Sequence, residues 1–288
     1  IGVSLLSAIS DAVTSVLGNA QDGIAFVFGP IGAFEMGFIF AFHVLPVIVF
    51  FSALVSVLYY LGIMGWIIRV IGGALQKLLG TSKAESMSAT ANIFVGQTEA
   101  PLVVKPYIPN MTRSELFAVM VGGMATVAGS VLAGYVLLGV ELRYLLAASF
   151  MAAPGGFLMA KMMIPETEEI VEDNKEIELK FDEHVNVIDA AAAGASSGMA
   201  LALNVGAMVL AFVGLIALIN AILAWAGGLV GFESLSLQLL LGYAFQPLAF
   251  LLGIPWAETN LAGSLIGQKL VFNEFVAFVA LTEQMERS

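Results

Sequence analysis

The sequence predicts an all-α polytopic membrane protein, and three observations carry this prediction. Hydrophobic residues make up 59% of the 288 positions, while charged residues make up only 11%. The mean hydropathy is +0.95. Residues 37 to 64 run for 28 positions without Asp, Glu, Lys or Arg. Because a soluble chain of this length carries about a quarter of its residues as charges, the composition favours transmembrane helices over a soluble core.

Charge and cysteine content narrow the class of function. The net charge is -11, but nine acidic residues lie between positions 166 and 183, so the acidity belongs mostly to one connecting loop. The chain has no Cys and only two separated His, His43 and His184, which excludes thiolate catalysis and a Cys/His metal cluster. We expect no organic cofactor and no nucleic-acid partner, and we interpret His43 as a packed histidine.

The pattern along the chain predicts spans and interfacial helices in a definite order. Residues 1 to 18 are amphipathic and predict an interfacial helix, which a Gly-rich turn at 29 to 32 follows. Residues 66 to 79 predict a second interfacial helix, and 234 to 254 a surface helix. Small residues at 190 to 200 predict close helix packing or an interfacial helix. The expected membrane spans are 37 to 64, 116 to 138, 144 to 160 and 199 to 226.

The positive-inside rule requires a segment that enters and leaves the membrane by one face. Seven of the basic residues fall on one side if residues 82 to 110 form a re-entrant hairpin, and that side is expected to be cytoplasmic. The uncharged run 86 to 98 is 13 residues long, which makes about 20 Å of helix and cannot cross a ~30 Å hydrocarbon core. Ser82 and Glu85 predict a capping box at its start, and Pro101 suits the first turn of the returning helix.

Residues 256 to 281 predict a second re-entrant hairpin, with a break at 272 to 274. It enters from the opposite side, so the two hairpins are expected to point at each other as an inverted repeat. Each break holds an acidic residue in apolar sequence, Glu99 or Glu274. Since a carboxylate at membrane depth costs about 2.5 to 3.5 kcal/mol, both are expected to face a solute pathway, and the pair favours a transporter.

The end of each half helix predicts a binding function. Carbonyls of Asn92 to Val95, the Asn92 side chain and the Thr126 hydroxyl form an oxygen cluster suited to a small monovalent cation. Gln97, Thr98 and Glu99 suit a polar, uncharged solute, and Glu274 suits neighbouring hydroxyls of that solute. Other readings stay open. Either acidic residue can pair with Lys105 or Lys269, Asn92 can join two helices, and Thr126 can bond back to its own helix.

Two stretches carry a family resemblance, GQTEAPL at 96 to 102 and the run from Gly267 to Phe278 with Lys269, Asn273 and Glu274. On these the chain resembles the concentrative nucleoside transporter family. The resemblance implies nucleoside uptake, for example of uridine, by an elevator movement of a transport domain against a trimeric scaffold in lipid. It places the protein in the bacterial inner membrane. The implied nucleoside site is Gly96, Gln97, Thr98, Glu99, Val131 and Glu274, and the implied sodium site is Asn92, Val95, Thr126 and Val127.

The expected domains follow from this reading. We assign 1–81 and 190–254 to the scaffold, 82–189 to the transport domain with the first hairpin, and 255–288 to the second hairpin. Family members continue into two further spans with an Asn-Phe-Ser-type break that is absent here, so we expect a partial sequence. A proton-coupled permease, a channel and an intramembrane hydrolase are the alternatives. The hydrolase lacks paired aspartates and a His-Glu-x-x-His motif.

Overall fold

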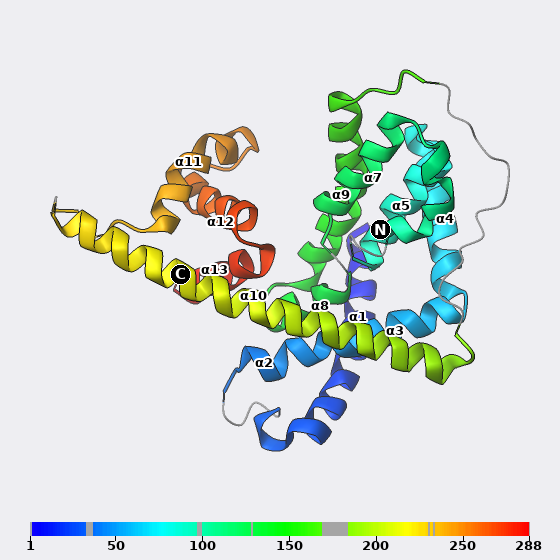
Figure 1. The fold of residues 1–288 in the computed structure, drawn as a ribbon, viewed down its shortest axis with the longest axis horizontal. Helices are drawn as coiled ribbons and strands as arrows, with labels where there is room; N and C mark the ends of the chain where they lie inside the picture. The colour runs from blue at the N-terminus through cyan, green and yellow to red at the C-terminus, as the bar shows by residue number, and fades with distance from the viewer. Residues whose placement is uncertain are drawn as a thin grey trace. The chain divides into compact units, whose positions relative to one another are not determined.

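The regular elements of the computed structural model are α-helices and short 3-10 helices (Figure 1). It describes residues 2–32, 37–96, 100–127, 129–168, 184–229, 231–232 and 234–287. No strand occurs among these residues, in agreement with the predicted all-α class. The chain divides into two compact units, Ile1–Leu201 and Ala202–Ser288. The boundary falls inside one long helix, and each unit is described by itself.

The first unit begins with helices that match the predicted order with shifted bounds. The first helix continues ten residues beyond the expected end at 18, and the Gly-rich segment after it forms a short 3-10 turn. The expected 37 to 64 span is nearly one helix, interrupted at Val44 because Pro46 has no N–H for a helical bond. These elements are α1 Gly2–Phe28, η1 Gly29–Ile31, α2 Phe40–His43, α3 Leu45–Tyr60 and α4 Ile63–Leu79.

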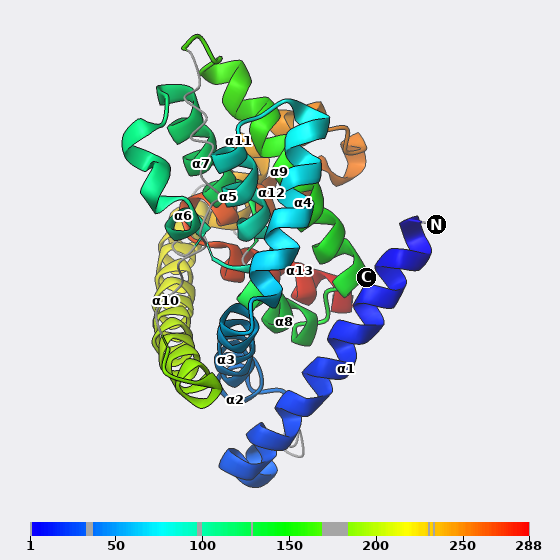
Figure 2. The same ribbon diagram turned by 90° about the vertical axis from the view of Figure 1, so that its right-hand side faces the viewer.

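The rest of the first unit is a bundle around α5, which lies against α4, α7 and α9 in both views (Figures 1 and 2). The predicted capping box of Ser82 and Glu85 is confirmed, and α7 begins with an equivalent box of Thr112 and Glu115. The bundle elements are α5 Lys83–Phe94, α6 Ala100–Val103, η2 Lys105–Asn110, α7 Arg113–Ala125, α8 Gly129–Leu137 and α9 Leu142–Met163.

The predicted span 116 to 138 contains a break. The segment 116 to 138 is divided into α7 and α8, because Thr126 leaves the helix with extended backbone at φ −103° and ψ 157°. The glycine that starts α8 then packs on the backbone at the end of α5. A straight helix would carry the chain past this contact, so the break in α7–α8 serves the packing against α5.

The helix α10, Val187–Leu229, has 43 residues and is about 64 Å long, which is more than twice the hydrocarbon thickness. The prediction that the small residues before 199 pack closely is confirmed. A Cβ on Gly194 would lie 2.9 Å from the Cα of Ala53, and one on Gly198 would lie 2.9 Å from the Cα of Val49. These residues are not a separate interfacial helix but the first turns of α10, and their Gly-x-x-x-Gly spacing lets α10 approach α3.

The second unit contains the rest of α10 and a packed helix pair. Gly242 of α11 and Gly263 of α12 bring the two backbones together, since a Cβ on Gly263 would lie 2.7 Å from the Gly242 carbonyl oxygen. Asn220 fixes the start of α11 by accepting a hydrogen bond from the Leu237 N–H at 2.7 Å. The elements are α11 Leu237–Leu251, η3 Trp256–Glu258, α12 Thr259–Val271 and α13 Glu274–Arg287.

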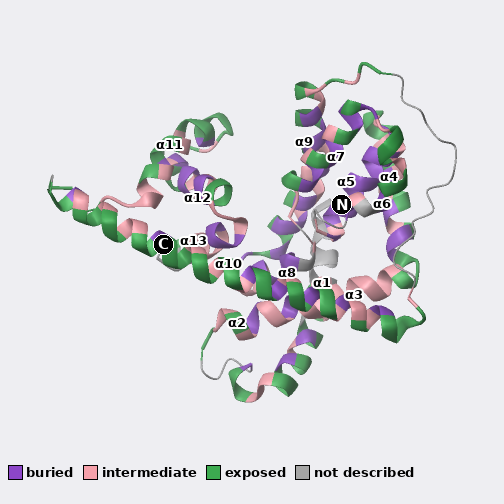
Figure 3. Ribbon diagram, in the orientation of Figure 1, coloured by how far each residue is buried: buried purple, intermediate pink, exposed green. Residues whose placement is uncertain are grey.

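Three helices among the described residues are long and apolar enough to cross a membrane, namely Phe40–Tyr60, Leu142–Met163 and Val187–Leu229. The helices differ in how many of their residues are buried (Figure 3). Much of α10 is exposed, and the exposed side chains include Leu210, Leu218 and Trp225. By contrast, α5 is buried from Ala84 to Ile93 although half of these residues are polar. Buried polar side chains are unusual in a core unless they have partners or a function, so α5 is a candidate part of a functional site.

Candidate functional site

Two helix breaks meet at the C-terminal end of α5. The helix ends at Phe94, and Val95 follows with extended backbone at φ −119° and ψ 171°. The second break, between α7 and α8, lies beside it, since a Cβ on Gly129 would approach the Phe94 carbonyl group, 2.7 Å from its carbon. The last carbonyls of a helix have no helical N–H partner. The meeting of two breaks therefore gathers backbone oxygens in one place.

The side chain of Asn92 is the most informative polar group at this place. It is fully buried, and neither its Oδ1 nor its Nδ2 has a hydrogen-bond partner among the described residues. The amide faces Gly122 of α7, where a Cβ would lie 3.6 Å from Nδ2. A buried amide without partners costs about 1 to 3 kcal/mol, so it requires an explanation such as a bound ion or water.

Thr126 lies at the same break, on the α7 side. Its hydroxyl donates a hydrogen bond to the Gly122 carbonyl at 3.1 Å, which confirms the back-bonding alternative. That bond uses the hydroxyl hydrogen and leaves the lone pairs of Oγ1 for another ligand. Back-bonding and cation binding are therefore compatible. Gly122 therefore lies beside both polar side chains, because its carbonyl binds Thr126 and its Cα faces the Asn92 amide.

The other predicted cation ligands lie around the breaks. Val95 is buried at the end of α5, and Val127 is half-buried in the extended segment after α7. The structure brings Asn92, Val95 and Thr126 into adjoining segments, and the donor set of amide and carbonyl oxygens suits a hard monovalent cation. Their role as ligands stays a prediction.

The predicted nucleoside ligands are distributed between the two units. Gly96 follows the first break, Val131 is buried on α8, and Glu274 is half-buried as the first residue of α13. The predicted break at 272 to 274 is confirmed, and Asn273 caps α13 by accepting a hydrogen bond from the Val276 N–H at 2.9 Å. Gln97, Thr98 and Glu99 lie outside the described residues.

Two further buried hydroxyl groups were not predicted from the sequence. Ser88 of α5 and Ser149 of α9 are fully buried, and neither hydroxyl has a hydrogen-bond partner in the described part of the chain. Ser88 lies one helical turn before Asn92 on the same face of α5. Ser149 precedes Phe150, whose ring contacts that of Phe94 with centroids 6.4 Å apart. Both are ordinary serines in the sequence, so only burial and missing partners single them out.

A polar cluster lies at the opposite end of α5. Lys161 Nζ contacts Glu85 Oε1 at 2.5 Å and donates a hydrogen bond to Ser114 Oγ at 2.9 Å. Glu166 accepts a hydrogen bond from the Thr112 hydroxyl at 2.7 Å and lies 3.6 Å from Lys161 Nζ. Burial acts to raise the pKa of Glu166, but the bonds from Thr112, the Glu168 N–H and Lys161 together lower it below the usual value of 4.5. The cluster therefore favours a charged Glu166.

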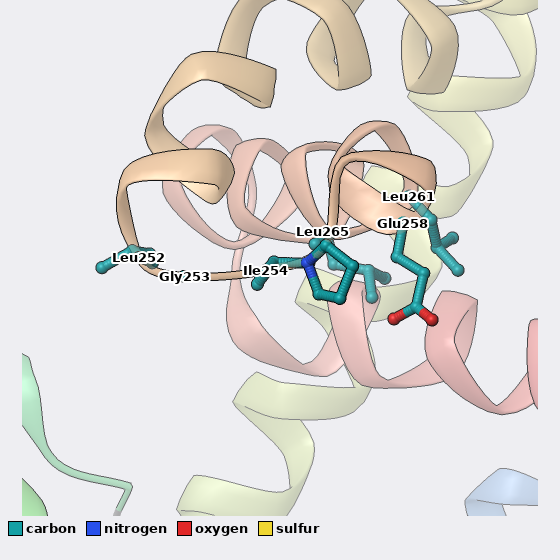
Figure 4. Close-up of a pocket in the computed structure, with 8 residues that line it drawn as sticks. Leu252, Gly253, Ile254, Glu258, Leu261 and Leu265 are labelled. Carbon is teal, nitrogen blue, oxygen red and sulfur yellow. The ribbon is translucent and has the colours of Figure 1, made fainter.

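A surface pocket in the second unit does not contain the expected site. Its volume is about 340 Å³, and apolar residues line it apart from the exposed Glu258 (Figure 4). Ligand sites have several convergent polar groups, which this hollow lacks. Its lining residues are Leu252, Gly253, Ile254, Pro255, Glu258, Leu261, Ala262 and Leu265.

Comparisons with known proteins agree with this architecture. Residues 144–288 match the family model described as Na+ dependent nucleoside transporter C-terminus, and residues 41–141 match the model described as nucleoside recognition. An uncharacterized transporter of Haemophilus influenzae is 58% identical over 99% of this chain and 69% of its own length. The nucleoside permease NupC of Helicobacter pylori is 52% identical, over 98% of this chain and 68% of its own.

A solved structure gives the same result for the fold. The structure of CNTnw in an inward-facing substrate-bound state has a TM-score of 0.92 and 57% sequence identity, and the match covers 99% of this chain and 68% of that chain. The chain thus belongs to the concentrative nucleoside transporter family, which comprises membrane transporters of nucleosides and not enzymes.

Proposed function

We propose that the chain forms the core of a transporter that imports nucleosides such as uridine together with sodium. The matching family model is described as sodium-dependent, which supports this coupling. The single observation that carries the proposal is the buried amide of Asn92, which has no hydrogen-bond partner among the described residues and lies beside two helix breaks. A sodium ion explains both features, because half-helix ends and unwound backbone in transporters coordinate sodium through their oxygens.

In this proposal Asn92 and Thr126 supply side-chain oxygens, and Val95 and Val127 supply carbonyls. All four lie in or next to the extended segments that interrupt α5–α6 and α7–α8. A hard cation prefers oxygen ligands, and each of these residues offers one. Bound sodium would hold the two breaks together and so organise the segment after α5.

The nucleoside site is proposed to adjoin this cation site. Gly96, Gln97, Thr98 and Glu99 follow the α5 break directly and would contact the base, with Val131 packing on it. Glu274 at the start of α13 would accept hydrogen bonds from the ribose hydroxyls.

We propose that both interrupted segments are re-entrant hairpins that meet as an inverted repeat. The half helices support this, since α5 has 12 residues and α12 has 13, which gives about 18 and 20 Å. Neither reaches across a ~30 Å hydrocarbon core. Residues 82–189 and 255–288 would then move as an elevator against a trimeric scaffold of 1–81 and 190–254. The expected location is the bacterial inner membrane.

Uptake of labelled uridine into liposomes that contain the full-length protein tests this function. We expect uptake to require an inward sodium gradient. A proton gradient imposed without sodium should not drive uptake. Uptake driven by the proton gradient alone would replace sodium by a proton as the coupling ion. If neither gradient drives uptake and uridine does not bind, coupled nucleoside import is wrong for this chain.

A further inference from the structure

The polar cluster at the N-terminal ends of α5 and α7 connects three helices through one cation. Lys161 lies in the last turn of α9 and is only partly exposed, while the Glu85 side chain that it contacts has no exposed surface. The same ammonium group binds Ser114 at the start of α7, and Ser114 donates a hydrogen bond to the Ile164 carbonyl at 2.8 Å. We call Lys161, Glu85, Ser114, Thr112 and Glu166 the polar anchor.

The polar anchor holds the first turns of α5 and α7 at the same level. Glu85 closes the capping box of α5, because its Oε2 accepts a hydrogen bond from the Ser82 N–H at 2.9 Å, and its Oε1 contacts Lys161. Thr112 is the N-cap of α7 and binds Glu166 just after α9. The helices α5 and α7 therefore start side by side and run in the same direction, opposite to α9.

Equal starting levels and nearly equal lengths bring the two breaks together. The helix α5 has 12 residues and α7 has 13, so both end about 18 to 20 Å from the polar anchor. The amide of Asn92 then faces Gly122, with each residue ten positions after the N-cap of its helix. The lengths of α5 and α7 thus set the distance between the polar anchor and the proposed cation site.

The polar anchor adds directional contacts to the apolar packing between these helices. The core that α5 shares with α7 and α9 combines the small residues Ala89, Ala118, Ala153 and Ala160 with the larger Ile93 and Phe157. Van der Waals contacts between such apolar side chains are not directional. Hydrogen bonds and ion pairs are directional, so the polar anchor favours one register of α5 on α7.

We propose that Lys161, through Glu85 and Ser114, is a positioning residue that sets the register of α5 on α7 and thereby builds the sodium site. The proposal rests on the sodium-coupled function proposed above. A displacement of α5 by one residue moves Asn92 by about 1.5 Å, which is enough to misplace a ligand. Loss of Lys161 should therefore weaken sodium binding while the ligands themselves stay unchanged.

The test compares Lys161→Met, Lys161→Arg and a matched control, Arg113→Met, in the full-length protein in liposomes. Arg113 is an exposed cation in the first turn of α7, so its replacement removes the same charge at the same end of the bundle. We expect Lys161→Met to raise the sodium concentration for half-maximal uridine uptake about tenfold, since misplacing a group by 1 Å can cost up to about a hundredfold. The maximal rate at saturating sodium should change much less.

Lys161→Arg should return the sodium dependence close to wild type, and Arg113→Met should leave it unchanged. Equal sodium dependence in wild type and Lys161→Met would overturn the proposal, as would an equal shift in Arg113→Met. A general structural defect would instead lower the maximal rate without this selectivity. If Lys161→Met does not accumulate, Ser114→Ala removes one contact of the lysine and should produce a smaller shift in the same direction.

Hydrogen–deuterium exchange gives a second readout that does not depend on coupling. We expect faster exchange of the α5 amides at 86–94 in Lys161→Met, with wild-type exchange in Lys161→Arg. Unchanged exchange in α5 would overturn the proposal. Absence of sodium dependence in the wild type, by contrast, would reject the proposed coupling, and the exchange data would still decide whether Lys161 positions α5.

Discussion

Gly129 of α8 packs on the backbone of Phe94 of α5, and a Cβ at position 129 would lie 2.7 Å from the Phe94 carbonyl carbon and 2.9 Å from its Cα. Only glycine allows this approach. The contact joins the two helix breaks, so it connects the local backbone geometry to the proposed cation site.

Gly129→Ala should disrupt the site, because the new methyl group meets backbone that cannot rotate away. Overpacking of this kind costs about 1 to 3 kcal/mol. We expect a lower melting temperature and weaker sodium-dependent uridine binding. Gly155→Ala in α9 is the control, since a Cβ there meets no atom of the described residues within 4 Å. Equal behaviour of the two variants would show that the 94–129 contact is unimportant.

Glu274→Gln should weaken uridine binding while leaving the amount of folded protein unchanged. The side chain keeps its shape, but a charge-assisted hydrogen bond worth about 1.5 to 3 kcal/mol is reduced, so affinity should fall by about tenfold or more. Titration calorimetry measures the affinity. Glu258→Gln, at an exposed carboxylate in the same unit, serves as the control. Unchanged affinity in Glu274→Gln would remove Glu274 from the ribose site.

Gly263→Ala should destabilise the α11–α12 pair. A Cβ at this position would lie 2.7 Å from the Gly242 carbonyl oxygen and 2.9 Å from the Gln246 backbone nitrogen. The helices must separate to accept it, at a cost of about 1 to 3 kcal/mol. Thermal melting of the purified protein should show the loss. By contrast, Gly228→Ala in α10, where a Cβ has no described atom within 4 Å, should melt at or above the wild-type temperature. The reverse order would contradict the packing described for this pair.

Glu166 should contribute stability that depends on pH. Its pKa in the folded protein lies below the usual 4.5, because the hydrogen bonds and Lys161 outweigh the effect of burial. A lowered pKa stabilises the fold above the unfolded value, and this contribution is lost as the pH falls through the folded value. Melting at pH 7 should therefore be lower for Glu166→Gln than for wild type. The difference should shrink below about pH 4, and a difference that stays constant with pH would exclude an ionised Glu166 as its source.

The sequence was sufficient for the helix class, for the order of the helices and for the start of α5, whereas the bounds of most helices differ from the predicted ones by several residues. Capping chemistry is local, so Ser82 with Glu85 predicted the start of α5, and Asn273 with Glu274 predicted the break before α13. The same local signals could have found Thr112 and Glu115, whose spacing repeats that of the first box 30 residues later.

Non-local packing accounts for what the sequence did not predict. The break in α7–α8 depends on contact between Gly129 and Phe94, which are 35 residues apart. The polar anchor joins Glu85 to Lys161 across 76 residues. Neither relationship has a periodic signature, because each arises only when helices that are distant in the sequence pack together. The meeting of the two hairpins stays a prediction.

The sodium dependence of uridine affinity in the wild type and in Asn92→Ala tests the central claim most directly. Titration calorimetry of the full-length protein over a range of sodium concentrations measures it, with Asn110→Ala as a control at an exposed asparagine. We predict that affinity rises with sodium in the wild type and in Asn110→Ala, and that Asn92→Ala flattens this dependence. An unchanged sodium titration in Asn92→Ala would contradict the claim that the buried amide at the two helix breaks binds the coupling ion.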